Sequence, residues 1–421
     1  MLTYDLDRRG KLARYDYLYR CIREDILAGR LTAGEKLPSK RSLASHLQTA
    51  VITVQNAYAQ LEAEGYLYTR EKRGYYVADV ERHPAAPGRA LARSAPQPQR
   101  SWLLDLSSGG SGTEDFPFSV WAKLMRRVLS EEGEALLRAT PPNGADALRR
   151  AIAQHLYRFR GISAAPEQIV VGAGTEYLYN LIVQLLGREA VYGVEDPGYS
   201  KAARIYALGG ARTAPVLVDE GGVSLRSLEM SGAQILHTSP NHQFPTGAVT
   251  PIGRRQSLLR WAEAREGRYI IEDDYDSEFR FTLRPIPTLQ SIDRAGRVIY
   301  VNTFSRTLAP SLRISYMVLP KSLTERYRAQ LGFYSSTVPA MEQHTLARFL
   351  DEGYFEAHIN RMRKSYRAQR DAVIDTILQS PLGEHCRVSG EDAGLHFLLT
   401  IDTKCTDHVL RADAEGRGVR L

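Results

Sequence analysis

Cysteine is scarce in this chain of 421 residues, which has only Cys21, Cys386 and Cys405. Three widely separated cysteines indicate reduced thiols in a cytoplasm, and they argue against a disulfide framework or a metal site, so we expect no metal-binding residues. No apolar run approaches the roughly 18 residues of a membrane-spanning helix. The mixed-charge N-terminus also lacks the apolar core of a secretory signal. We therefore expect a cytoplasmic protein with no membrane partner.

The rest of the composition is ordinary for a globular protein, with 43% hydrophobic and 24% charged residues. The length suffices for two domains with a sizeable core. The formal net charge is +7. This modest excess is compatible with a nucleic-acid partner but does not require one.

Residues 15–77 have the pattern of a small helical domain. Apolar side chains recur at helical spacing before Gly29, and Ser39 is placed to cap a second helix that runs to Leu47. A third helix is expected from about Thr53 to Glu64.

Two short aromatic runs, 66–69 and 75–77, then flank the basic turn 70–74, which predicts a β-hairpin. Three helices followed by a basic hairpin indicate a winged helix-turn-helix, which places one helix in the major groove of DNA. Basic residues that occur singly most often only form a solvated face of a protein. The prediction of DNA binding therefore rests on the basic residues together with the ordered helices and hairpin.

The motifs LPSKRSLASHL and TVQNAYAQLEAEGYLYTREKRGYYV closely resemble the GntR-type DNA-binding domain. The resemblance implies double-stranded DNA as the partner. It implies DNA-contacting roles for Ser39, Lys40, Arg41, Thr53, Gln55, Lys72, Arg73 and Gly74. Val51 stands where the family usually has a basic residue, so weaker affinity or base preference is expected.

The segment from Asp79 to Ser101 is rich in proline, alanine and arginine, which predicts a semi-rigid linker. We therefore divide the chain into a DNA-binding domain (1–78), this linker (79–101) and a large domain (102–421).

The large domain alternates apolar runs with amphipathic helices, which is typical of an α/β fold with a mainly parallel sheet. The expected strands are 169–171, 190–194, 234–236, 268–271 and 298–301. Polar loops follow them: GAGT, EDPGY, HTSPNHQFPTG, EDDYD and TFSR. Ligands bind at the carboxyl ends of such strands, so these loops are expected to converge on one site.

The stretch YVNTFSRTLAPSLRISYMVLP places two hydroxyls and two arginines after a strand: Thr303, Ser305, Arg306 and Arg313. Hydroxyl and guanidinium donors suit a phosphate. Read singly, each feature has a plainer interpretation. The acidic cluster EDDYDSE could be a solvated loop, Tyr199 a core residue, and Arg313 a structural ion pair.

Taken together, the loops resemble those of fold-type I aminotransferases, which use pyridoxal phosphate. The resemblance implies that Asp273 binds the ring nitrogen of the cofactor, Tyr275 its ring hydroxyl, and Tyr199 its face. It assigns the phosphate to Gly174, Thr175, Thr303, Ser305 and Arg313.

A winged helix joined to such a domain resembles the MocR/GabR subfamily of GntR-type transcription regulators. EDDYDSEF and GYFEAHINRMRKSYRAQRD also match this subfamily. The resemblance implies a homodimer whose DNA binding responds to an amino compound or to pyridoxal phosphate itself. The alternative is a pyridoxal-phosphate-dependent aminotransferase with an accessory DNA-binding domain.

Three departures qualify the resemblance. Arg306 occupies the place of the lysine that bonds the cofactor, and a guanidinium is too poor a nucleophile to form a Schiff base. We therefore expect no catalytic residue there, no transaminase activity, and a cofactor bound non-covalently or lost. The family's carboxylate-binding arginine, expected beyond Leu421, is not in this sequence. Ser200 and Lys201 follow the stacking tyrosine, and Lys201 could pair with an effector carboxylate.

Overall fold

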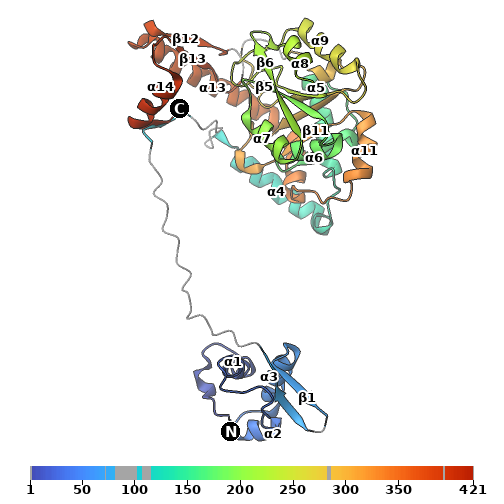
Figure 1. Ribbon diagram of the computed structural model, residues 1–421, viewed down its shortest axis with the longest axis vertical. Coiled ribbons are helices and arrows are strands. Elements are labelled where there is room, and N and C mark those ends of the chain that lie inside the picture. Colours follow the sequence, from blue (N-terminus) through green and yellow to red (C-terminus); the bar gives the residue numbers. More distant parts are fainter. Residues whose placement is uncertain are drawn as a thin grey trace. The chain divides into compact units, whose positions relative to one another are not determined.

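The computed structural model describes residues 2–71, 73–80, 102–106, 115–281, 286–391 and 394–420. The chain forms two compact units, Met1–Arg100 and Ser101–Leu421 (Figure 1). Most of the predicted linker, residues 81–101, lies outside the described residues.

The first unit contains three α-helices and a hairpin. Its elements are η1 (Leu6–Arg9), α1 (Arg14–Leu27), α2 (Lys40–His46), α3 (Val51–Ala63), β1 (Leu67–Arg70) and β2 (Gly74–Val77). The two strands are antiparallel, and Leu67 pairs with Val77. The apolar stripe of α1 packs on α3 in one core that includes Leu18, Ile22 and Leu61.

Local sequence signals account for the helix boundaries in this unit. The Ser39 side chain accepts a hydrogen bond from the Ser42 amide at 3.2 Å, which confirms it as the cap of α2. The predicted start of α3 at Thr53 was wrong, because the helix already begins at Val51. Gly65 follows α3 with a φ of +79°, a conformation that glycine adopts without strain.

The second unit is an α/β domain around an eight-stranded sheet (Figure 1). Its strands, in sheet order, are β4 (Ile169–Gly172), β11 (Ser315–Val318), β10 (Val298–Thr303), β9 (Tyr269–Asp273), β8 (Ile235–Thr238), β5 (Val191–Asp196), β6 (Arg212–Asp219) and β7 (Gly222–Val223). Strands β5, β6, β8, β9 and β10 are parallel to their neighbours in this group. The sheet is mainly parallel, as the sequence predicted, with β11 antiparallel between β10 and β4.

Alternate residues of the strands point into different apolar cores. Ile299 and Val301 pack with α6 (Thr175–Leu186), α7 (Ser200–Leu208) and α11 (Lys321–Leu331). Tyr300 lies in another core. That core is formed mainly by α4 (Phe118–Glu132), α5 (Asp146–Arg160), α12 (Ala340–Asp351) and α13 (Tyr354–Gln379). A third cluster involves α8 (Leu225–Met230), α9 (Ile252–Glu263) and α10 (Leu289–Ile292). The sheet is thus covered on both faces, which explains its nearly continuous apolar strands.

The chain ends in smaller elements, drawn in red in Figure 1. These are β12 (Cys386–Ser389), β13 (Leu398–Ile401), α14 (Asp407–Gly416) and β14 (Val419–Arg420). Strands β12 and β13 form a hairpin, and β14 pairs in parallel with β3 (Leu104–Asp105). Within the described parts of the chain, no helix is both long and apolar enough to cross a membrane.

Candidate cofactor pocket and nucleic-acid interface

The loops at the carboxyl ends of the parallel strands enclose a cavity of about 530 Å³, including the part open to solvent. Its lining residues are Thr175, Tyr179, Tyr199, Ser239, Phe244, Asp273, Tyr275, Thr303 and Arg306. Its size and mixed lining are typical of a small-molecule site. Six of these residues were candidates from the sequence, whereas Tyr179, Ser239 and Phe244 were not.

Asp273 ends β9, and one of its carboxylate oxygens is held by neighbouring side chains. Its Oδ2 accepts a hydrogen bond from the Tyr179 hydroxyl at 2.5 Å, and the His237 Nε2 lies 3.5 Å away. His237 is itself held at 2.6 Å by Tyr206. The other carboxylate oxygen, Oδ1, is buried and has no hydrogen-bond partner among the described residues. An unsatisfied buried carboxylate oxygen is costly, so its presence beside a cavity indicates a place for a donor.

Two tyrosines flank this carboxylate. Tyr199 is the residue preceding α7 and packs edge-on against Phe244, with ring centroids 6.4 Å apart. Tyr275 follows β9, and its hydroxyl lies 3.3 Å from the Nδ1 of His242. Burial raises the pKa of both tyrosines, and the positive charge of Arg306 opposes the rise. Both phenols are therefore protonated at neutral pH and can act as hydrogen-bond donors.

The predicted phosphate-binding residues are only partly assembled. Thr175 opens α6 and Gly174 is its N-cap, a position where helix amides favour an anion. The Gly174 amide, however, already donates to the Gly172 carbonyl at 2.8 Å. The buried hydroxyl of Ser305 has no hydrogen-bond partner in the described chain. The Thr303 hydroxyl, in contrast, is engaged by the Ser315 hydroxyl at 2.7 Å.

Arg313 is turned to a different partner than the sequence suggested. Its guanidinium donates to the Oε2 of Glu176 at 2.6 Å, and Lys201 lies 3.9 Å from the same carboxylate. It adjoins the Gly174–Thr175 loop, since a Cβ on Gly174 would overlap the guanidinium. Glu176 is therefore a functional candidate that the sequence reading missed. Glu176 directly follows Thr175, and this place next to a predicted phosphate-binding residue was the only feature of the sequence that could have indicated it.

In the first unit, the predicted DNA-binding residues lie at the helix starts and the hairpin. Lys40 opens α2 and lies over the Tyr75 ring at 5.8 Å, and Arg41 is exposed beside it. Thr53 and Gln55 lie in the first turns of α3, half-buried and exposed respectively. Arg73 belongs to the hairpin turn, Gly74 opens β2, and Lys72 lies outside the described residues.

Comparisons with known proteins give a family match for each of the two units. Residues 14–77 match the family described as bacterial regulatory proteins, gntR family. Residues 103–407 match aminotransferase class I and II. The chain is 38% identical over its whole length to the uncharacterized HTH-type transcriptional regulator YdeL of Bacillus subtilis, 91% of which is covered.

The chain is a MocR-type member of the GntR family. It is 35% identical over 99% of its length to 87% of the probable rhizopine catabolism regulatory protein MocR of Rhizobium meliloti. It is 34% identical over 90% of its length to 82% of the pyridoxine biosynthesis regulator PdxR of Corynebacterium glutamicum. This MocR-type protein is therefore a DNA-binding transcription regulator with an aminotransferase-like domain.

Solved structures agree on the fold of the large domain. The kynurenine aminotransferase of Pyrococcus horikoshii superimposes with a TM-score of 0.67 at 24% identity, over 77% of this chain and 81% of that one. The α-aminoadipate aminotransferase LysN of Thermus thermophilus gives 0.66 at 27% identity, over 75% and 81%. The fold-type I architecture predicted from the sequence is confirmed.

Proposed function

We propose that this regulator binds pyridoxal phosphate without a covalent bond to the chain and uses the occupied pocket to sense a small amino compound or the cofactor itself. The observation that carries the proposal is the unpartnered Oδ1 of Asp273, a residue that lines a cavity together with Arg306, which stands in the lysine position. An ionised carboxylate there suits a protonated pyridine nitrogen, because a charge-assisted hydrogen bond would satisfy it.

The other residues present fit the same group. Tyr275 would donate to the ring hydroxyl, and Tyr199 would cover the ring face. The Thr175 amide and the unpartnered hydroxyl of Ser305 would hold the phosphate, joined by Arg313 once it leaves Glu176 and by the Gly174 amide once it leaves the Gly172 carbonyl. Pyridoxal phosphate, when bound, supplies an electron-accepting ring. The chain supplies no amine at residue 306, so we propose that the domain has no transaminase activity.

On the DNA side, we assign Ser39, Lys40 and Arg41 to the phosphate backbone and Thr53 and Gln55 to the major groove. Arg73, with Lys72 and Gly74, would form the wing. We also propose the division 1–78, 79–101 and 102–421, a homodimer, and a cytoplasmic location. Lys201 would contact an acidic group of the effector once it is released from Glu176.

A titration of the purified protein with pyridoxal phosphate, followed by absorbance and tyrosine fluorescence, tests the proposal. Asp273→Asn is nearly isosteric and should weaken binding roughly 10-fold or more, because a hydrogen bond to a charged group contributes about 1.5–3 kcal/mol. Asp219→Asn is the control for removing a carboxylate charge, since Asp219 is exposed, pairs with Arg254, and neither residue lines the pocket. Equal affinities in all three proteins would refute the assignment.

DNA binding is tested separately with an electrophoretic mobility shift on DNA from upstream of the protein's own gene. We expect a shift whose midpoint changes when pyridoxal phosphate is added. A protein that shifts no DNA with or without the cofactor would contradict the regulatory role.

A further inference from the structure

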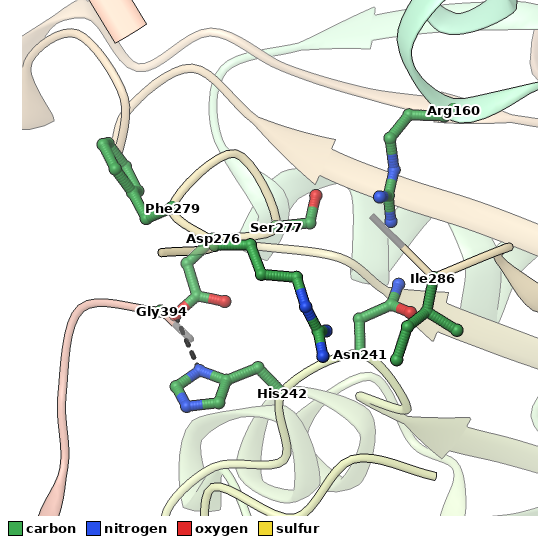
Figure 2. A pocket seen from close by; sticks show the side chains of 9 residues that line it. Arg160, Asn241, His242, Asp276, Ser277, Phe279, Ile286 and Gly394 are labelled. Carbon is green, nitrogen blue, oxygen red and sulfur yellow. Dashed lines mark hydrogen bonds and ion pairs between the residues drawn. The ribbon is translucent and has the colours of Figure 1, made fainter. Parts of the chain in front are cut away.

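A second group of side chains that could bind a metal adjoins the candidate pocket, since His242 lies 3.3 Å from the Tyr275 hydroxyl and Phe244 packs on His396 with ring centroids 5.2 Å apart. His242, Asp276 and His396 each place one possible metal-ligating atom within 4.8 Å of the other two. His242 and Asp276 are almost fully buried, with 3% and 2% of their surface exposed. Figure 2 shows the His242 ring and the Asp276 carboxylate facing each other, with Gly394 beside them.

The hydrogen bonds of the two imidazoles leave one nitrogen of each without a partner. The Nδ1 of His242 lies 2.9 Å from the Oδ2 of Asp276, so it donates its proton to the carboxylate. His396 is hydrogen-bonded to the backbone of Pro245. The Nε2 atoms of both rings are buried and have no partner within the described residues. Metal-binding histidines are held in this way, with one ring nitrogen fixed by a carboxylate or carbonyl and the other free for the ion.

The backbone around the cluster is adapted to this close approach. Gly394 has a φ of +74°, and a Cβ there would overlap both His242 and Asp276. Two amides of the same turn also bond to the central domain. The Gly394 amide donates to the Phe279 carbonyl at 2.7 Å, and the Leu395 amide donates to the Asp276 Oδ2 at 3.2 Å. The turn that carries His396 is thereby anchored against the central domain.

We propose that His242 and His396 bind a divalent transition-metal ion, with zinc as the best match, through their Nε2 atoms. Asp276 is the outer partner that orients His242, and water completes the coordination. Imidazole donors favour zinc, copper, nickel and iron over magnesium or calcium. Zinc–nitrogen bonds are about 2.0–2.1 Å, so both rings must bring their Nε2 atoms to within that distance of the ion.

Such an ion would link residues that are far apart in the sequence. His242 lies in the loop after β8, whereas His396 lies two residues before the start of β13. The ion would therefore fasten the β12–β13 hairpin region to the loops that carry Tyr275. Arg280 lines the adjoining cavity, and the charge of Arg306 acts on His396. Both positive charges oppose a dication, so the affinity should be below that of a closed four-ligand zinc site.

The test uses the full chain, treated with a chelator and kept free of pyridoxal phosphate and inorganic phosphate. Calorimetric titration with zinc should give one equivalent per chain, and cobalt should give the visible absorption of an imidazole-bound ion. His242→Gln and His396→Gln should each weaken binding by more than about 100-fold. Asp276→Asn should weaken it about 10–100-fold, the usual cost of losing an outer partner.

His155→Gln is the matched control. His155 is also buried and faces a carboxylate, Glu356, at 3.7 Å, but it belongs to no such three-residue group among the described residues. It should leave zinc binding unchanged. Circular dichroism monitors folding. If His242→Gln fails to fold, His396→Gln is the variant that decides, because His396 is only partly buried. Wild-type protein that binds no more zinc than His396→Gln, or equal losses in His155→Gln, would overturn the proposal.

Discussion

Glu176 is expected to oppose cofactor binding, and removing its charge should strengthen that binding. Its carboxylate holds Arg313 at 2.6 Å and lies 3.9 Å from Lys201, directly beside the Gly174–Thr175 loop. All three side chains are substantially exposed, and exposed pairs contribute about 0.2–1 kcal/mol. Glu176→Gln no longer requires that pair to break when Arg313 turns to a phosphate. Pyridoxal phosphate should therefore bind roughly 1.4- to 5-fold more tightly.

The assay is a titration with pyridoxal phosphate at two salt concentrations. The gain should shrink at high salt, because exposed charges are screened. Glu131→Gln is the matched control, since Glu131 also forms an exposed pair with an arginine, Arg348, outside the pocket lining. The gain should vanish when Arg313→Gln is combined with Glu176→Gln. Unchanged or weaker binding in Glu176→Gln would refute the view that Arg313 is available to the phosphate.

Two further predictions concern DNA binding and pH. Val51 is 43% exposed at the first position of α3, so Val51→Arg should raise DNA affinity and steepen the logarithmic salt dependence by about 1; a mobility-shift series with unchanged slope would contradict this. Burial and the charge of Asp274 raise the pKa of Glu272 to about 7. The folded state therefore holds this proton more tightly, and stability falls as pH rises from about 4.5 to 7. Glu272→Gln should make the free energy of unfolding in urea less dependent on pH across that window, and an identical slope would contradict the assignment.

Local patterns predicted the elements whose signals are contained within a few residues. Ser39 caps α2 because its side chain reaches an amide three residues on. The aromatic runs around the basic turn form β1 and β2, and these two strands pair with each other across that short turn. Strand β11 was not predicted. Its residues 315–318 lie inside the stretch first singled out for phosphate binding, and their strand character depends on pairing with β4 and β10 on either side.

In the pocket, too, the residues with a local sequence signal could be predicted and those placed by long-range contacts could not. Residues directly after a strand, such as Asp273 and Thr303, could be expected to converge because parallel strands end at one edge. Tyr179 lies in the interior of α6, and its contact with Asp273 spans 94 positions. His396 meets His242 only after the C-terminal region has folded back on the central domain. Such long-range pairings leave no periodic trace in the sequence. The cofactor role of the predicted residues itself stays a prediction.

The central claim is that the pocket retains the contacts for pyridoxal phosphate while Arg306 prevents a covalent bond. Borohydride reduction in the presence of pyridoxal phosphate, followed by mass spectrometry of the intact chain and its peptides, tests this most directly. The account predicts that Arg306→Lys is labelled at residue 306, with a shifted cofactor absorbance, and that the wild-type protein is not labelled in the pocket. Specific labelling of another lysine in the wild-type protein, or no labelling of the variant despite cofactor binding, would contradict it.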